Sequence, residues 1–426
     1  MIKQISFFLC AVLIFQNLPG QSQLVKVKGH QFYLNEHSLY YIGANYWYGG
    51  VLALKKDKQK GINRLKKELD FLKLHGVNNL RVLAGAEGSG LINGVNRVGP
   101  PLQIEEGIFD TGYLKGMDVL LSELGKRKMT AVIYLSNNWN WSGGFLQYLQ
   151  WNNLISAAAF NEEIPWSELG EYTSRFYTCE KCIADYLNQV KYVIAHTNSI
   201  THKKYSEEPA IMAWEIANEP RPMRHSVIDS YKKFISNAAS FIKSLDGNHL
   251  ITTGTEGYMS TESIQLYKDI HDDKNIDYLT IHIWPKNWAW FENGKMAEQY
   301  AKAEKLTRDY IAEHIRVAKK LNKPLVIEEF GLPRDAQSFD ISAKTKLRDR
   351  YFQTVFSYIK SEPFIAGANF WAFGGTARPI KDQLFWKAGD DYMGDPPMEE
   401  QGLYSIFDKD RSTWKVISRS ARRLRP

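Results

Sequence analysis

Short apolar stretches alternate along this chain with longer stretches that carry apolar residues on one helical face. Eight mainly apolar stretches lie at 39–45, 77–83, 129–135, 210–216, 250–253, 277–283, 325–328 and 366–370. Their apolar residues run together instead of alternating, which is typical of parallel strands covered on both faces. The stretches between them, such as 61–75, 113–126, 172–197 and 296–321, predict helices. Eight strand–helix units predict an α/β fold, a (β/α)8 TIM barrel, with its active site at the carboxyl ends of the strands.

Two of the predicted strands end abruptly in glutamates. Residues 214–221 read Trp-Glu-Ile-Ala-Asn-Glu-Pro-Arg, and residues 324–331 read Pro-Leu-Val-Ile-Glu-Glu-Phe-Gly. Pro220 cannot donate a ladder hydrogen bond, and Gly331 allows a tight exit from its strand. Glu219 therefore ends strand four and Glu329 ends strand seven. Cleavage of a glycosidic bond requires such a pair, with one carboxyl protonated and the other ionised.

Spacing alone does not select one glutamate in each stretch. Glu328 and Glu329 are neighbours, so in a regular strand they point to opposite faces and only one of them enters the site. Glu215 lies four residues before Glu219, deeper in the barrel, where a carboxylate needs a partner of its own.

Polar and aromatic residues end most of the other strands. Arg81 is expected to hold the second carboxylate ionised, and Asn218 to bond a sugar 2-hydroxyl. Trp371 is expected to form the floor under the sugar at the cleavage point, although it and His282, each taken alone, also fit ordinary barrel packing. The candidate substrate-binding residues at strand ends are Trp47, Arg81, Asn138, Trp139, Asn218, His282, Trp284 and Trp371.

Composition narrows the class of protein. The chain has 426 residues, including 12 Trp and 23 Tyr, and a net charge of +7. The positive charge is spread along the chain without an interleaved basic and aromatic pattern, so no nucleic-acid binding is expected. An acidic cluster at 390–400 lacks the regular spacing of calcium ligands. We therefore expect neither a metal nor a cofactor.

The first 22 residues predict a secretory signal peptide. Lys3 precedes an apolar run at 7–15, and no later run has the ~20 apolar residues that a membrane helix needs. Residues 23–426 are then a single catalytic domain, secreted to the periplasm or the external medium. Cys179 and Cys182 form a lone CxxC, for which a disulfide is expected in an oxidising compartment and a free dithiol is the alternative.

The ordered motifs resemble glycoside hydrolase family 5, and within it the endo-β-1,4-mannanases. The resemblance rests on residues 218–221, 137–139, 143–148, 329–331 and 394–402. It implies that Glu219 is the acid/base, that Glu329 is the nucleophile of a retaining mechanism, and that Arg221 contacts a sugar on the leaving-group side. Many relatives carry His-x-Tyr on strand six, whereas this chain has Trp284 in place of the Tyr. Arg81 is then expected to carry more of the support for the nucleophile.

The function that this resemblance implies is internal cleavage of β-mannan, as mannan, glucomannan or galactomannan, by a secreted monomer. An endo-β-1,4-glucanase and an exo-acting β-mannosidase of the same family stay open, because sequence does not show whether a loop blocks one end of the cleft. A non-catalytic glycan-binding barrel is the more distant alternative. It would be expected to have lost one of the two glutamates, and both are present.

Overall fold

The eight predicted strands form a parallel barrel at the centre of the molecule. The computed structural model describes residues 24–92, 94–156, 158, 160 and 164–424, so the predicted signal peptide lies outside the described residues. The barrel strands are β4 (Tyr41–Asn45), β5 (Asn79–Leu83), β10 (Thr130–Tyr134), β11 (Ile211–Glu215), β12 (Leu250–Thr252), β13 (Leu279–Ile283), β14 (Leu325–Phe330) and β15 (Ile365–Phe370). They pair in the order β12-β11-β10-β5-β4-β15-β14-β13. Hydrogen bonds from Asp277 N to Ile251 O (2.8 Å) and from His282 N to Glu256 O (3.0 Å) bring the two end strands together and close the ring.

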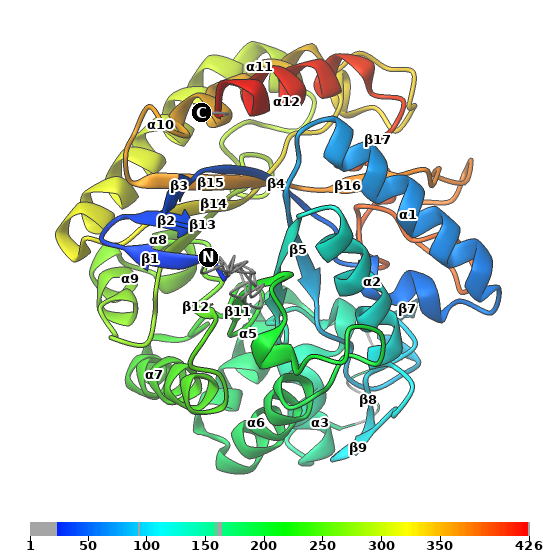
Figure 1. The fold of residues 1–426 in the computed structure, drawn as a ribbon, viewed down its shortest axis with the longest axis vertical. Coiled ribbons are helices and arrows are strands. Elements are labelled where there is room, and N and C mark those ends of the chain that lie inside the picture. Colours follow the sequence, from blue (N-terminus) through cyan, green and yellow to red (C-terminus); the bar gives the residue numbers. More distant parts are fainter. Residues whose placement is uncertain (1–23, 93, 157, 159, 161–163, 425–426) are drawn as a thin grey trace, which may run out of the picture.

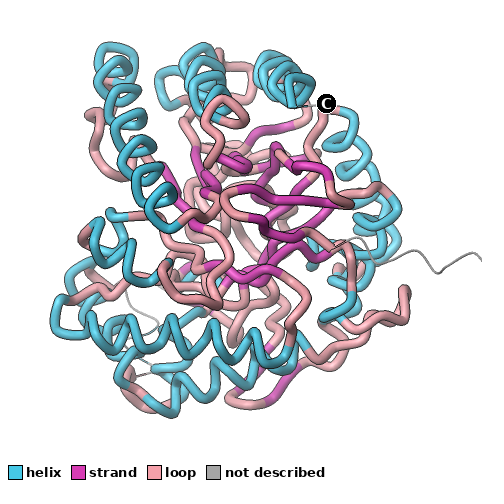
Figure 2. Tube along the Cα trace, turned by 60° about the vertical axis from the view of Figure 1, so that its left-hand side comes forward, coloured by secondary structure: helices cyan, strands magenta, loops and turns pink. Residues whose placement is uncertain are grey.

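Helices surround the barrel and cover the outer faces of its strands (Figure 1; Figure 2). They are α1 (Lys58–Leu74), α2 (Leu114–Lys126), α3 (Gly144–Trp151), α5 (Trp166–Ser174), α6 (Glu180–Ile194), α7 (Ile228–Leu245), α8 (Tyr258–Thr261), α9 (Ile264–His271), α10 (Met296–Leu321), α11 (Lys346–Tyr358) and α12 (Arg411–Leu424). In α1, for example, Leu65, Leu69 and Leu72 are buried at helical spacing and face the core. The predicted (β/α)8 barrel is confirmed.

One predicted helix is broken. The stretch 172–197 contains the end of α5, a 3-10 turn at Arg175–Thr178 and then α6. Cys179 interrupts the helix because its backbone is extended (φ −91°, ψ 94°), and it caps α6 instead of continuing α5. None of the helices in the described part of the chain is both long and apolar enough to cross a membrane.

A small antiparallel sheet closes the amino-terminal end of the barrel. It contains β1 (Lys26–Lys28), β2 (Gln31–Leu34) and β3 (His37–Leu39). Phe32 of β2 is fully buried, and its ring lies 5.2 Å from that of Tyr278 and 6.3 Å from that of Tyr41. These aromatic rings belong to the lowest layer of the barrel interior.

Short ribbons and loops extend from the carboxyl ends of the strands. The ribbons are β6 (Leu91–Ile92) with β7 (Val95–Asn96), β8 (Gln103–Glu105) with β9 (Ile108–Phe109), and β16 (Phe373–Gly375) with β17 (Ile406–Phe407). In the last loop, Asp395 accepts hydrogen bonds from the backbone N–H groups of Gly402 (2.9 Å), Tyr404 (2.9 Å) and Ser405 (3.1 Å). Part of the acidic cluster at 390–400 thus holds a loop together.

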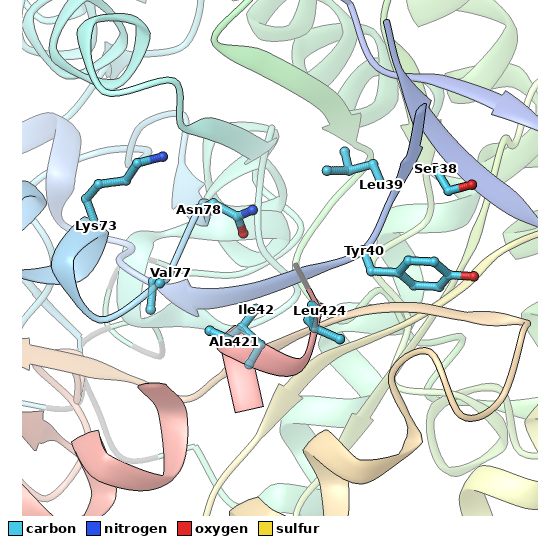
Figure 3. A pocket seen from close by; sticks show the side chains of 10 residues that line it. Ser38, Leu39, Tyr40, Ile42, Lys73, Val77, Asn78, Ala421 and Leu424 are labelled. Atoms are coloured by element: carbon cyan, nitrogen blue, oxygen red, sulfur yellow. The ribbon is translucent and has the colours of Figure 1, made fainter. Parts of the chain in front are cut away.

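A pocket of about 260 Å³ lies at the opposite end of the barrel from these loops (Figure 3). Leu39, Ile42, Val77, Asn78 and Ala421 are among the residues that line it. Leu39 ends β3, Ile42 belongs to β4, Val77 and Asn78 come just before β5, and Ala421 belongs to α12. The strand ends that carry Glu219 and Glu329 do not contribute to it.

Cys179 and Cys182 are joined by a disulfide at the start of α6, with their Cα atoms 5.2 Å apart. Because the loop that they close is very short, we expect reduction to lower the free energy of unfolding by less than ~2 kcal/mol. Denaturant unfolding with and without reductant measures this change. Thiol counting under denaturing conditions should find no free cysteine in exported protein, and full reactivity of both cysteines would contradict the disulfide.

Candidate active site

A buried arginine joins the strand ends that carry the candidate residues. Arg81 of β5 is 0% exposed, and its guanidinium donates to Glu215 on β11 (2.8 and 2.5 Å). It also donates to Asn218 (2.7 Å) and Asn45 (3.1 Å), and it pairs with Glu329 of β14. Glu215 therefore has the partner that its depth in the barrel requires, and Arg81 also contacts Glu329.

Glu219 lies just beyond β11 and accepts three N–H donors. Its backbone has a φ of +51°, a left-handed conformation that is uncommon for a residue with a side chain. Its carboxyl is 6% exposed and accepts from Trp139 Nε1, from His282 Nδ1 (2.7 Å) and from Trp284 Nε1 (3.3 Å). The indole on strand six therefore bonds Glu219, whereas the Tyr of the relatives is expected to bond the nucleophile.

Glu219, His282 and Glu329 come together at the carboxyl end of the barrel. One ligand atom from each lies within 4.8 Å of the other two, and His282 Nδ1 is 3.4 Å from Glu329 Oε2. Three such groups could hold a metal ion, but the Arg81 guanidinium already occupies Glu329 and would repel a second cation. The arrangement suits exchange of a proton between two carboxyls.

The two carboxyls titrate as a pair. Burial raises the pKa of Glu329 to about 7, against the opposing charges of His282 and Arg81. Burial acts on Glu219 in the same direction, but the hydrogen bond and charge of His282 outweigh it and its pKa falls to about 2. Because the two carboxyls interact strongly, they titrate together. The pair holds one proton between about pH 2 and about pH 7.

Glu328 and Glu329 both approach Arg81. Glu328 Oε2 lies 3.8 Å from Arg81 Nε, and Glu329 pairs with the same guanidinium. The expectation that only one of these neighbours turns inward is wrong, because the register between β13 and β14 shifts between Ile281 and His282, opposite Glu329. A bulge of this kind breaks the strict alternation of a strand.

A second ion pair lies beside Glu219. Arg221 pairs with the buried Glu256, and its guanidinium lies 5.0 Å from the ring centroid of Trp139. Burial raises the pKa of Glu256 to about 7, although the charge of Arg221 opposes this. Sequence reasoning missed Glu256, yet it follows β12 by four residues, and the rule that strand ends line the site would have found it.

The remaining candidates are buried at the same end of the barrel. Both polar atoms of the Asn138 amide lack a hydrogen-bond partner among the described residues. Trp47 is 2% exposed and donates its indole N–H to Gly394 O (2.9 Å). Trp371 is 3% exposed and lies edge-on to Trp284, with ring centroids 5.7 Å apart. Their contacts with a sugar stay predictions.

Comparison with known proteins places this site in a family. A family model described as "GH family 5 beta-mannosidase-like" matches residues 22–426. The chain belongs to glycoside hydrolase family 5. The resemblance found in the sequence is therefore confirmed, and this family 5 chain is a glycoside hydrolase.

Curated relatives and solved structures agree with the assignment to family 5. Mannan endo-1,4-beta-mannosidase 5 of Arabidopsis thaliana is 28% identical over 436 residues, which cover 96% of this chain and 92% of that protein. A glycoside hydrolase family 5 mannosidase from Rhizomucor miehei is 30% identical, with a TM-score of 0.85 over 95% of this chain and 98% of that one. An endo-beta-1,4-mannanase from Thermotoga petrophila, 23% identical, has the same fold with a TM-score of 0.66 over 92% and 78% of the two chains.

The titration of the carboxyl pair predicts the pH dependence of this family 5 enzyme. Activity requires one shared proton, so kcat/KM should fall as the pH rises through about 7, where the pair loses that proton. On the acid side it should fall only near pH 2, where Glu219 also becomes protonated. Initial rates at low substrate concentration across this range measure both limbs. An alkaline limb that stays flat above pH 9 would contradict the assignment.

Proposed function

We propose that this protein is a secreted, retaining endo-β-1,4-mannanase. The observation that carries the proposal is the pair Glu219 and Glu329, with carboxylate oxygens within 4.8 Å of each other. Retaining enzymes have carboxyl groups about 5–5.5 Å apart, whereas inverting enzymes leave about 6.5–9.5 Å for a water molecule. The short separation supports direct attack by one carboxylate on the sugar.

In this mechanism Glu329 attacks the anomeric carbon while Glu219 protonates the departing oxygen. Arg81 keeps the attacking oxygen of Glu329 oriented and favours its ionised form. The glycosidic oxygen of a bound substrate accepts a hydrogen bond, which favours the protonated form of Glu219. Glu219 then removes a proton from the water that hydrolyses the glycosyl-enzyme.

We propose mannan as the substrate because of the relatives of this chain and because of the residues around Glu219. The curated relative named above is a mannan endo-1,4-beta-mannosidase, and one Rhizomucor miehei mannosidase structure is a complex with mannosyl-fructose. Arg221, stacked on Trp139 and paired with Glu256, offers a charged and aromatic surface next to the acid/base. Such a surface suits a sugar on the leaving-group side.

An exo-acting β-mannosidase is the second candidate. It is favoured by the description of the matching family as β-mannosidase-like and by the 30% identity to a protein called a mannosidase. The proposal of a secreted monomer with one catalytic domain at 23–426 rests on the signal-like sequence of residues 1–22 and on the single barrel.

Digestion of polysaccharides tests the substrate and the mode of attack. We expect mannan and glucomannan to give a ladder of oligosaccharides with rapid loss of viscosity, and carboxymethyl-cellulose to stay intact. Release of mannose alone with a slow loss of viscosity would instead establish exo action. Proton NMR should show the β-anomer as the first product, and an α-anomer would contradict the retaining mechanism.

Replacing the proposed nucleophile should abolish turnover without unfolding the protein. Glu329→Ala should lower kcat by about 10⁴-fold or more while glycan binding persists, because the step that it performs has no substitute. Glu298→Ala, at an exposed position of α10, is the matched control and should keep wild-type rates. A Glu329→Ala enzyme within tenfold of wild type would overturn the assignment.

A further inference from the structure

Glu328 is a fully buried carboxylate that the proposed mechanism does not use. It is 0% exposed, and neither of its oxygens makes a hydrogen bond to a described residue. Arg81 Nε and His282 Nε2 are charged neighbours of this side chain, each 3.8 Å from Glu328 Oε2. A buried carboxylate without hydrogen bonds is costly, so its presence beside the nucleophile calls for a role.

His282 spans the space between the catalytic pair and Glu328. Its Nδ1 lies 2.7 Å from Glu219 Oε1 and 3.4 Å from Glu329 Oε2. Its Nε2 has no hydrogen-bond partner among the described residues and faces Glu328. A carboxylate that faces one ring nitrogen of a histidine keeps a proton on that nitrogen. The other ring nitrogen can then donate or accept a proton.

The charges around His282 favour its protonated form. Burial alone would lower its pKa, but the charge of Glu329 and the contacts with Glu219 and Glu328 outweigh this and raise it to about 10. The charges of Glu215 on β11 and of Glu256 beyond β12 also interact with His282, and Arg81 of β5 pairs with Glu329 beside it. In the free enzyme, the His282 imidazolium therefore lies between the carboxyls of Glu219, Glu328 and Glu329.

We propose that Glu328 is a positioning residue that keeps a proton on His282 Nε2, so that His282 Nδ1 can exchange a proton with Glu219. This rests on the proposed function and adds to it the route by which Glu219 becomes an acid. A movement of less than 1 Å would bring the 3.8 Å separation into hydrogen-bond range.

The exchange conserves charge and atoms. The Nδ1–H bond of the imidazolium breaks and an O–H bond forms on Glu219, which leaves a neutral imidazole with its proton on Nε2, next to Glu328. Glu219 passes that proton to the departing glycosidic oxygen. In the second step Glu219 takes a proton from the attacking water, and the proton returns to Nδ1.

Two substrates that differ in their leaving group distinguish a role of Glu328 in proton transfer from a purely structural role. A mannoside with a dinitrophenolate leaving group needs no protonation, whereas a mannosyl–mannose bond does. Glu328→Gln and Glu328→Leu should lower kcat/KM for mannooligosaccharides by about tenfold or more, within the roughly 10²–10⁴ that general acid–base catalysis contributes. Both variants should keep kcat/KM for the activated mannoside within about threefold of wild type.

The same variants should shift the pH profile in a defined direction. The negative charge of Glu328 raises the pKa of Glu329 as well as that of His282, so without it the alkaline limb for mannooligosaccharides should move down from about pH 7 by about one pH unit. Glu215→Gln is the matched control, because it removes a buried carboxylate from Arg81 without a contact to His282 Nε2. The Glu215→Gln variant disturbs Arg81, which holds the nucleophile Glu329, so it should lower kcat/KM for both substrates by a similar factor.

Each outcome decides the proposal. Equal losses on both substrates in the Glu328 variants, or unchanged rates and pH profile, would overturn it. If neither variant folds, ¹⁵N-histidine NMR of the wild-type protein decides, because the proposal requires the neutral His282 ring to carry its proton on Nε2, and a neutral ring protonated on Nδ1 would overturn it. A wild-type protein inactive on every mannoside would instead refute the proposed function.

Discussion

A buried guanidinium needs carboxylates around it, and this requirement organises the carboxyl end of the barrel. Arg81 is fully enclosed and is held by residues from β4, β11 and β14 as well as by Asn218 just beyond β11. Removing one partner of such a buried pair typically costs about 3–5 kcal/mol, because the other charge is left uncompensated. The strand ends are therefore fixed relative to one another by the charge that also orients Glu329.

Glu329 and Glu219 differ in the kind of donor that each carboxyl contacts. Glu329 is held by a permanent cation, whereas Glu219 accepts three N–H donors, two of them from indoles. Guanidinium and indole donors cannot give up a proton, but the imidazole of His282 can. Of these three donors, His282 is therefore the one that can pass a proton to Glu219 or take one from it. Trp284, which stands where the resemblance implies a Tyr, adds a second donor from strand six to Glu219.

The barrel, and the meeting of Glu219 and Glu329 at its carboxyl end, followed from the sequence because both depend on local patterns. Continuous apolar runs specify strands covered on both faces, and Pro220 and Gly331 mark where two of them stop. Glu328 and Glu256 did not follow. The inward turn of Glu328 comes from a register shift between β13 and β14, which is a property of two strands together. The role of Glu256 depends on Arg221, which reaches it across 35 residues of sequence.

The central proposal is that Glu329, held by Arg81, forms the covalent bond to the sugar. A 2-deoxy-2-fluoro mannosyl fluoride forms a glycosyl-enzyme that breaks down slowly, and tandem mass spectrometry of the digested protein locates the attached sugar. The account predicts the sugar on Glu329 and on no other residue. A label on Glu328 or Glu219, or an enzyme inactivated without any covalent sugar, would contradict it.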